Sequence, residues 1–178
     1  FVDNEDFFHK RNRFYDDDGN FYEDNDERTI FFNKGAIEIL LKLGWMPDII
    51  HCHGWMTGLI PLYARTIYKN EPVFRQGKIV YTAYQDVIDE QLGDNFVKKT
   101  HLKRNADKVK DTLTNPRPVD IQKVGASYAD AVSEGDTQIA DELKTHIGSL
   151  NKPTLGYQDP GSEAFTNAYV DLYQKLLS

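Results

Sequence analysis

Two histidines separated by a single residue, His51 and His53, are the side chains best suited to chemistry in this chain. They end an apolar run, and Gly54 and then Trp55 follow, where a helical pattern of apolar residues begins. This order predicts a short buried strand over 49–52, a sharp turn and a helix N-terminus. Ligands of open α/β sheets bind beyond the carboxyl ends of the strands, so we expect a functional site at this turn.

The two histidines allow several interpretations. Alternate side chains of a strand share a face, so His51 and His53 could converge on a metal ion. A zinc site needs three or four ligands, and no third ligand is evident, so we expect no metal. His51 fits a hydrogen-bonded core histidine, whereas His53 fits a ligand-binding role and a loop-structuring role equally well. Cys52 has no partners that would make it a nucleophile.

The composition narrows the classes of protein. The chain has 178 residues, of which 40% are hydrophobic, as expected for one globular domain with a core. A net charge of -7 argues against nucleic-acid binding. No apolar run is long enough to cross a membrane, and a single cysteine favours a reducing compartment, so we expect a cytoplasmic protein. Residues 97–123 are the exception, with eight basic and three acidic residues, and a solvated face is the simplest explanation.

Strand-like and helical segments alternate along the chain. Strand patterns cover 49–52, 78–83, 130–133 and 153–157, and helical patterns cover 24–43, 55–68, 87–113, 119–128, 139–147 and 160–177. Asp159 is expected to cap the last helix, with Pro160 at its first position. The alternation predicts an α/β fold with a Rossmann-like parallel sheet and helices on both faces. We expect one domain over 1–178 with an excursion at 3–29, and an N-terminal segment of the natural protein before Phe1, because no Met opens the chain.

Two separated motifs resemble a known family. Asp24-Asn25-x-x-Arg28 stands at a helix start, and the stretch from Pro47 to Pro61 reads Pro-Asp-Ile-Ile-His-Cys-His-Gly-Trp-Met-Thr-Gly-Leu-Ile-Pro. Together with the opening Phe-Val-Asp-Asn, Phe7-Phe8 and the strand at 79–82, they resemble bacterial glycogen synthases and plant starch synthases (glycosyltransferase family 5). The resemblance covers roughly residues 1 to 85 and is strongest to short, single-domain bacterial relatives.

The resemblance implies the N-terminal half of a GT-B glycosyltransferase, in which two Rossmann-like halves face each other across the active site. Such enzymes transfer glucose from a sugar nucleotide, such as ADP-glucose, to an α-1,4-glucan, and they use no metal. His53 would be the catalytic residue beside the transferred sugar. The substrate-binding residues would be Asp24, Asn25, Arg28, Trp55 and Thr57. Asp24 also fits an ordinary helix cap, and Trp55 an ordinary core residue.

The sequence departs from the family pattern at two places beside this turn. Gly54 stands where the family usually has Asp, and Ala83-Tyr84 stands where it usually has His-Asn. Two hypotheses follow. The chain is part of a glucosyltransferase that binds α-glucan or glucose and needs a partner chain, a second copy or a further segment to complete its site. Alternatively, it is a non-catalytic glucan-binding or regulatory protein derived from a synthase domain.

Overall fold

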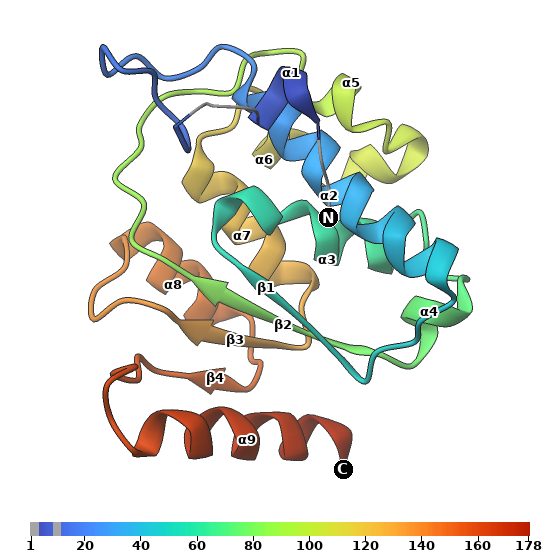
Figure 1. Ribbon diagram of the computed structural model, residues 1–178, viewed down its shortest axis with the longest axis vertical. Coiled ribbons are helices and arrows are strands. Elements are labelled where there is room, and N and C mark those ends of the chain that lie inside the picture. Colours follow the sequence, from blue (N-terminus) through green and yellow to red (C-terminus); the bar gives the residue numbers. More distant parts are fainter. Residues whose placement is uncertain (1–3, 9–11) are drawn as a thin grey trace.

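A four-stranded sheet forms the centre of the molecule. The computed structural model describes residues 4–8 and 12–178, so the predicted motif positions Phe1, Val2 and Asp3 lie outside the described part. The strands are β1 (Ile49–His53), β2 (Lys78–Ala83), β3 (Ala131–Glu134) and β4 (Thr154–Leu155). They lie in the order β1-β2-β3-β4, and each neighbouring pair is parallel, which confirms the predicted sheet (Figure 1).

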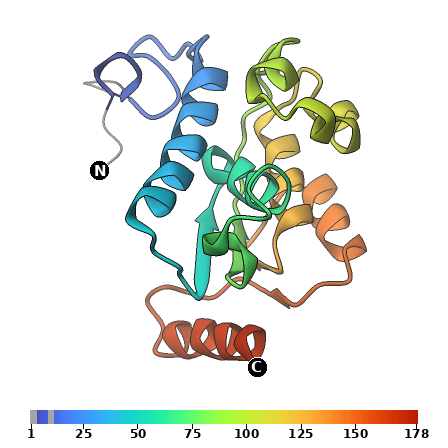
Figure 2. The same cartoon turned by 90° about the vertical axis from the view of Figure 1, so that its right-hand side faces the viewer.

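Helices cover both faces of the sheet, as the sequence predicts. The helices α2 (Asn25–Leu43), α3 (Leu59–Arg65) and α7 (Pro118–Tyr128) lie on one face, with α8 (Asp141–Ser149) beside α7. Of the described helices, only α9 (Ala164–Leu177) covers the other face, as Figure 2 shows. The shorter helices are α1 (Glu5–Phe8), η1 (Trp55–Thr57), α4 (Pro72–Arg75), α5 (Phe96–Thr100), η2 (Lys103–Lys108) and α6 (Lys110–Leu113).

The alternation of side chains along β1 decides what each face of the sheet contacts. Ile50 and Cys52 point into the larger core, which α2, α3 and α7 close. Ile49 points to the opposite side and packs with Leu172 and Leu176 of α9. The apolar stripe predicted for the last helix therefore docks on the sheet, and β1 is covered on both faces as a strand of a parallel sheet requires.

The predicted helix over 87–113 is wrong at its start. Residues 84–93 follow an irregular path, and backbone N–H groups within the predicted helix are bound by a later segment of the chain. Leu92 N–H donates to the carbonyl of Pro116 at 2.9 Å, and Gly93 N–H donates to Asn115 Oδ1 at 2.9 Å. A backbone amide that is held by another segment cannot take part in a continuous helical ladder.

The rest of that segment forms three short helical turns in place of one helix. His101 has φ 57° and Lys103 has φ 53°, and these left-handed residues separate α5 from η2. Leu102, Val109 and Leu113 are all buried. These residues therefore have helical spacing in the sequence because successive short turns each direct an apolar side chain into the same core, and not because they belong to one helix.

The last helix begins at Ala164, so the predicted start at Pro160 is wrong. Residues 160–163 form turns. Asp159 Oδ1 accepts the N–H of Gly161 at 2.9 Å, and the Asp159 carbonyl accepts the N–H of Ser162 at 2.9 Å. Asp159 thus caps a local turn, and Gly161 in this turn favours it over a helical start. Within the described residues, no helix has the length and apolar character to span a bilayer.

Candidate functional site

His53 is the last residue of β1 and is exposed at the carboxyl edge of the sheet. Its ring stacks on the ring of His51 with 4.1 Å between centroids, and its Nδ1 lies 3.1 Å from the hydroxyl of Tyr84. Partial burial lowers the pKa of His53 below its ordinary value. The imidazole is therefore neutral at pH 7, and one ring nitrogen donates a hydrogen bond while the other accepts one.

His51 lies beneath His53 in a chain of short hydrogen bonds. Its Nδ1 is 2.6 Å from the Tyr173 hydroxyl on α9, and its Nε2 is 2.6 Å from the Thr82 hydroxyl. Thr82 is in turn 2.6 Å from the hydroxyl of Ser133, so the chain joins β1, β2, β3 and α9. Burial, and secondarily the charge of His53, lower the pKa of His51 to about 4. The prediction of a hydrogen-bonded core histidine is confirmed.

The turn after His53 depends on Gly54, at the position where the family resemblance predicts an aspartate. Gly54 has φ 70° and ψ 175°, a backbone conformation that is almost restricted to glycine. Its N–H donates to the carbonyl of Thr82 at 3.0 Å. The Thr57 hydroxyl bonds the carbonyls of His53 and Gly54, each at 3.0 Å. Thr57, a predicted substrate-binding residue, therefore holds the backbone of the turn.

A carboxylate reaches the same place from the neighbouring strand. Asp86 follows β2, and its side chain accepts the backbone N–H of Trp55 and the Nε2 N–H of Gln122, the latter at 3.0 Å. Burial and the nearby Asp136 raise the pKa of Asp86 to about 6, against the smaller opposing effects of Arg13 and the Trp55 N–H. The residue-by-residue motif comparison missed Asp86. Parallel strands end at the same edge of the sheet, and this geometry was the signal that could have identified it.

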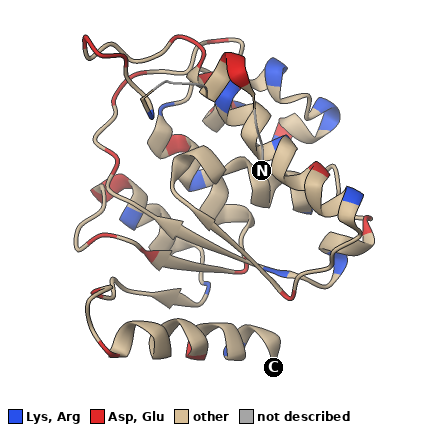
Figure 3. Ribbon diagram, in the orientation of Figure 1, with Lys and Arg blue, Asp and Glu red and all other residues tan. Residues whose placement is uncertain are grey.

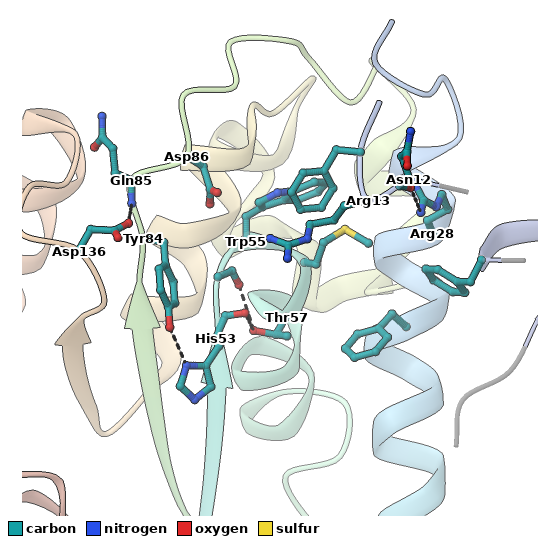
Figure 4. Close-up of a pocket in the computed structure, with 15 residues that line it drawn as sticks. Asn12, Arg13, Arg28, His53, Trp55, Thr57, Tyr84, Gln85, Asp86 and Asp136 are labelled. Carbon is teal, nitrogen blue, oxygen red and sulfur yellow. Dashed lines mark hydrogen bonds between the residues drawn. The ribbon is translucent and has the colours of Figure 1, made fainter. Parts of the chain in front are cut away.

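A cavity of about 700 Å³ opens above these residues, and we call it the His53 pocket. Figure 4 shows that Tyr84, Gln85, Asp86 and Asp136 lie on its β2 side, and Asn12 and Arg28 on its α2 side. The cavity is lined by Phe8, Asn12, Arg13, Phe14, Arg28, Phe32, His53, Gly54, Trp55, Met56, Thr57, Tyr84, Gln85, Asp86 and Asp136. The structure thus brings four predicted site residues together, namely His53, Arg28, Trp55 and Thr57.

Most of the Asp24-Asn25-x-x-Arg28 motif lies behind the wall of the pocket, and only Arg28 of its three named residues lines the cavity. Arg28 is 2% exposed, donates from Nη1 to Asn25 Oδ1 at 2.6 Å, and lies over the rings of Phe8 and Tyr22. Asn25 is fully buried. Asp24 occupies the N-cap position of α2 without a side-chain cap hydrogen bond, and neither Asp24 nor Asn25 lines the pocket. A direct substrate contact of these two residues stays a prediction.

Trp55 is 1% exposed and belongs mainly to the core. Its ring packs against Phe14 at 5.0 Å and Phe21 at 6.5 Å between centroids. The excursion before α2 therefore lies over the turn because aromatic residues from both segments pack together. Trp55 contributes an apolar edge to the pocket, and its role in substrate binding also stays a prediction.

The structure offers little for a metal or for a cysteine nucleophile. Among residues 4–8 and 12–178, no group of three or more His, Cys, Asp and Glu side chains is arranged to hold a metal ion. Cys52 is buried, and this burial raises the pKa of its thiol to about 12. The thiol is therefore protonated at neutral pH and unsuited to nucleophilic attack.

The fold is that of an α/β protein with a pocket at the carboxyl edge of a parallel sheet, the edge at which such folds bind ligands. The family profile of the starch synthase catalytic domain matches residues 1–153, and the chain belongs to this family. A glycogen synthase of Photobacterium profundum is 30% identical over 174 residues, which cover 93% of this chain and 31% of that protein. A glycogen synthase of Chlorobium phaeobacteroides is 35% identical and is matched over 34% of its length. The chain thus spans about a third of these relatives.

A solved structure shows a similar fold. The catalytic domain of starch synthase IV from Arabidopsis thaliana, bound to ADP and acarbose, superposes with a TM-score of 0.57 at 20% identity. The match covers 83% of this chain and 32% of that one. The predicted GT-B-type architecture of this part of the chain is therefore confirmed at the level of the fold.

Proposed function

We propose that the His53 pocket binds glucose units of an α-1,4-glucan, and that the chain forms part of a synthase that transfers glucose from a sugar nucleotide such as ADP-glucose. The observation that carries the proposal is the exposed, neutral His53, which lies beside Tyr84 in a pocket that also holds Asp86. Membership of the starch synthase family supports the choice of substrate and reaction. The starch synthase of similar fold was solved with ADP and acarbose.

The pocket suits a sugar because it combines hydrogen-bond donors, hydrogen-bond acceptors and apolar ring faces. Glucose hydroxyls both donate and accept hydrogen bonds, and neutral His53 can meet either need. The Asp86 carboxylate accepts from hydroxyls when it is ionised, and with its pKa of about 6 the ionised form dominates at pH 7. Phe14 and Tyr84 line the same cavity and offer apolar faces for the C–H groups of a sugar ring.

The described pocket supports the binding of glucan better than the departure of a nucleotide. A leaving diphosphate needs cations or N–H donors directed at its oxygens. Arg13 and Arg28 are the cations among the described lining residues, and Arg28 is almost fully buried. We therefore propose that phosphate-binding residues come from a further segment, a second copy or a partner chain, and that Asp24 acts on the acceptor side.

A transfer assay tests the proposal. The purified chain is incubated with glycogen and radiolabelled ADP-glucose or UDP-glucose, and incorporation is compared with the His53→Ala variant. We expect glycogen to bind in calorimetry and His53→Ala to weaken this binding about tenfold, because a hydrogen bond to a polar group is lost. Transfer that is lost in His53→Ala would establish catalysis in this chain. If glycogen fails to bind, the proposal is wrong.

A further inference from the structure

A second cavity, of about 900 Å³, lies apart from the His53 pocket. It is bordered by α2, by the turn that follows α3, and by residues 101–105, which connect α5 to η2 and form the start of η2. We call it the basic hollow, because its side chains include Lys34, Lys69, His101, Lys103 and Arg104. Among the described residues that line it, none is an aspartate or a glutamate.

The basic side chains of residues 97–123 are of two kinds, those paired with carboxylates and those without an ion pair among the described residues. Lys99 Nζ is paired with Asp26 at 2.6 Å and with Glu27 at 2.9 Å. Arg117 and Lys123 are both paired with Glu142, at 2.9 and 2.6 Å. These three charges are neutralised by carboxylates of neighbouring helices, so they need no ligand.

Lys103 and Arg104 belong to the other kind. Both are exposed, and neither makes an ion pair with a residue in the described part of the chain. Figure 3 shows basic residues on α5 and on η2, beside α2. The left-handed backbone at His101 and Lys103 turns the chain sharply between these two helices.

Lys34 brings a further positive charge into the same cavity from α2. Its Nζ is 2.9 Å from Nδ1 of His101 and lies over the Tyr63 ring at 5.8 Å. The structure places an imidazole and an aromatic face beside this ammonium, and no carboxylate within ion-pair distance among the described residues. Partial burial accordingly lowers the pKa of Lys34. An anion in the hollow would offset this loss of hydration.

We propose that the basic hollow binds the phosphate group of a small phosphorylated compound of about hexose-phosphate size. Its concave, single-sign lining concentrates positive potential, although the chain as a whole has a net charge of -7. Lysine and arginine side chains are the usual partners of phosphate oxygens. The amides of Asn70 and Asn105 line the same cavity and suit the hydroxyls of an attached sugar. The volume lies within the range typical of small-molecule sites.

The basic hollow is separate from the pocket of the proposed function. Arg28 and Phe32 of α2 line the His53 pocket, whereas Lys34 of the same helix lines the basic hollow. Within residues 4–8 and 12–178, no residue lines both cavities. The two proposals can therefore fail independently.

Amide chemical-shift titration of the whole chain with inorganic phosphate tests the inference, with sodium chloride of matched ionic strength as the reference. We expect saturable shifts in residues 66–70 and 101–105, and an association constant about tenfold lower in Lys103→Gln and in Arg104→Gln, since each loses a charged contact. Lys108→Gln and Lys110→Gln remove equal charge from exposed residues outside the hollow, so they should change binding less than twofold.

Three further ligands show which kind of phosphate compound the hollow binds: a hexose monophosphate, the free hexose and a short single-stranded DNA. A hexose monophosphate should bind more tightly than inorganic phosphate, and the free hexose should not shift residues 101–105. The inference is wrong if chloride reproduces the phosphate shifts, or if the control variants weaken binding as much as Lys103→Gln. It is also wrong if a short single-stranded DNA shifts these residues while phosphate and hexose phosphate do not.

Discussion

The His53 pocket and the basic hollow are built from different kinds of segment. The pocket groups stand at the ends of β1 and β2, where the chain of hydrogen bonds through His51 and Thr82 connects the strands. The charged groups of the hollow are exposed side chains on the turn after α3 and at the start of η2, with His101 before it, apart from Lys34 on α2. Among the described lining residues, the first cavity combines a neutral imidazole with carboxylates and with Arg13 and Arg28, and the second has only basic ionisable side chains besides Tyr68.

This difference indicates two modes of recognition. Groups fixed by strands and by buried hydrogen bonds can distinguish the positions of hydroxyls on a sugar ring. Cations that have no carboxylate partner among the described residues attract an anion by charge and depend less on its shape. We therefore expect stereochemical selectivity in the His53 pocket, and sensitivity to ionic strength in the basic hollow.

The largest expected effect comes from replacing one histidine in each cavity by asparagine. If the chain catalyses transfer, His53→Asn should lower the rate about a hundredfold, as removal of one positioned donor commonly does. His101→Asn should leave transfer unchanged and weaken phosphate binding, and asparagine tolerates the left-handed backbone at this position. Transfer assays and phosphate titrations of both variants measure the two effects. Equal losses in both assays for either variant would show that the cavities are not independent.

A second prediction concerns the support beneath the pocket. His51→Ala removes the hydrogen bonds of this ring to Tyr173 and to the buried Thr82 hydroxyl and leaves a void beneath His53, so we expect the free energy of unfolding at pH 7 to fall by about 3 kcal/mol. Tyr173→Phe removes one hydrogen bond to the same ring and should cost about 1 kcal/mol. Urea denaturation of the three proteins measures both values.

The pH dependence of the stability lost in His51→Ala tests whether the fold holds His51 in its neutral form. The pKa of His51 in the fold is about 4, below the ordinary value of 6.5, so the unfolded chain binds the proton first. The stability that neutral His51 provides is present above pH 6.5 and is lost as the pH falls towards 4. The difference between the parent protein and His51→Ala should narrow over this interval. A constant difference would show that His51 is not held neutral by the fold.

The smallest effect is expected at Asp86, and it has the opposite sign. The pKa of Asp86 is raised to about 6 from an ordinary value of 3.8, so its ionisation destabilises the fold as the pH rises through this interval. Asp86→Asn should raise the free energy of unfolding at pH 7 by about 1 kcal/mol, after allowance for solvent screening. Denaturation at pH 7 and at pH 3.5 measures the gain, which should vanish at the lower pH.

Glycogen binding by the same variant separates stability from function. We expect Asp86→Asn to bind glycogen more weakly although it unfolds less readily, because the carboxylate accepts a sugar hydroxyl. Asp136→Asn is the matched control, since it removes the second cause of the raised pKa and leaves the Asp86 carboxylate in place. Unchanged glycogen binding in Asp86→Asn would remove this residue from the proposed site.

The sequence by itself determined the parallel sheet, the location of the turn at His53, and the family. Apolar runs that end in glycine, and helices closed by residues such as Gly44, are local signals that do not depend on distant partners. The same local reasoning failed over residues 87–93, because Asn115 and Pro116, which come later in the sequence, hold the backbone N–H groups of Leu92 and Gly93 there.

Only the tertiary structure decided which side chains share a cavity. It placed Asp86 beside the turn where Gly54 lacks a carboxylate, and it gathered Lys34, Lys69 and Lys103 from three separate segments. Burial and the distances between charges set the pKa of each group, and both depend on residues far apart in the chain. A sequence motif identifies residue types and spacing, whereas the charge and hydrogen-bond partners of a site emerge only when the elements pack together.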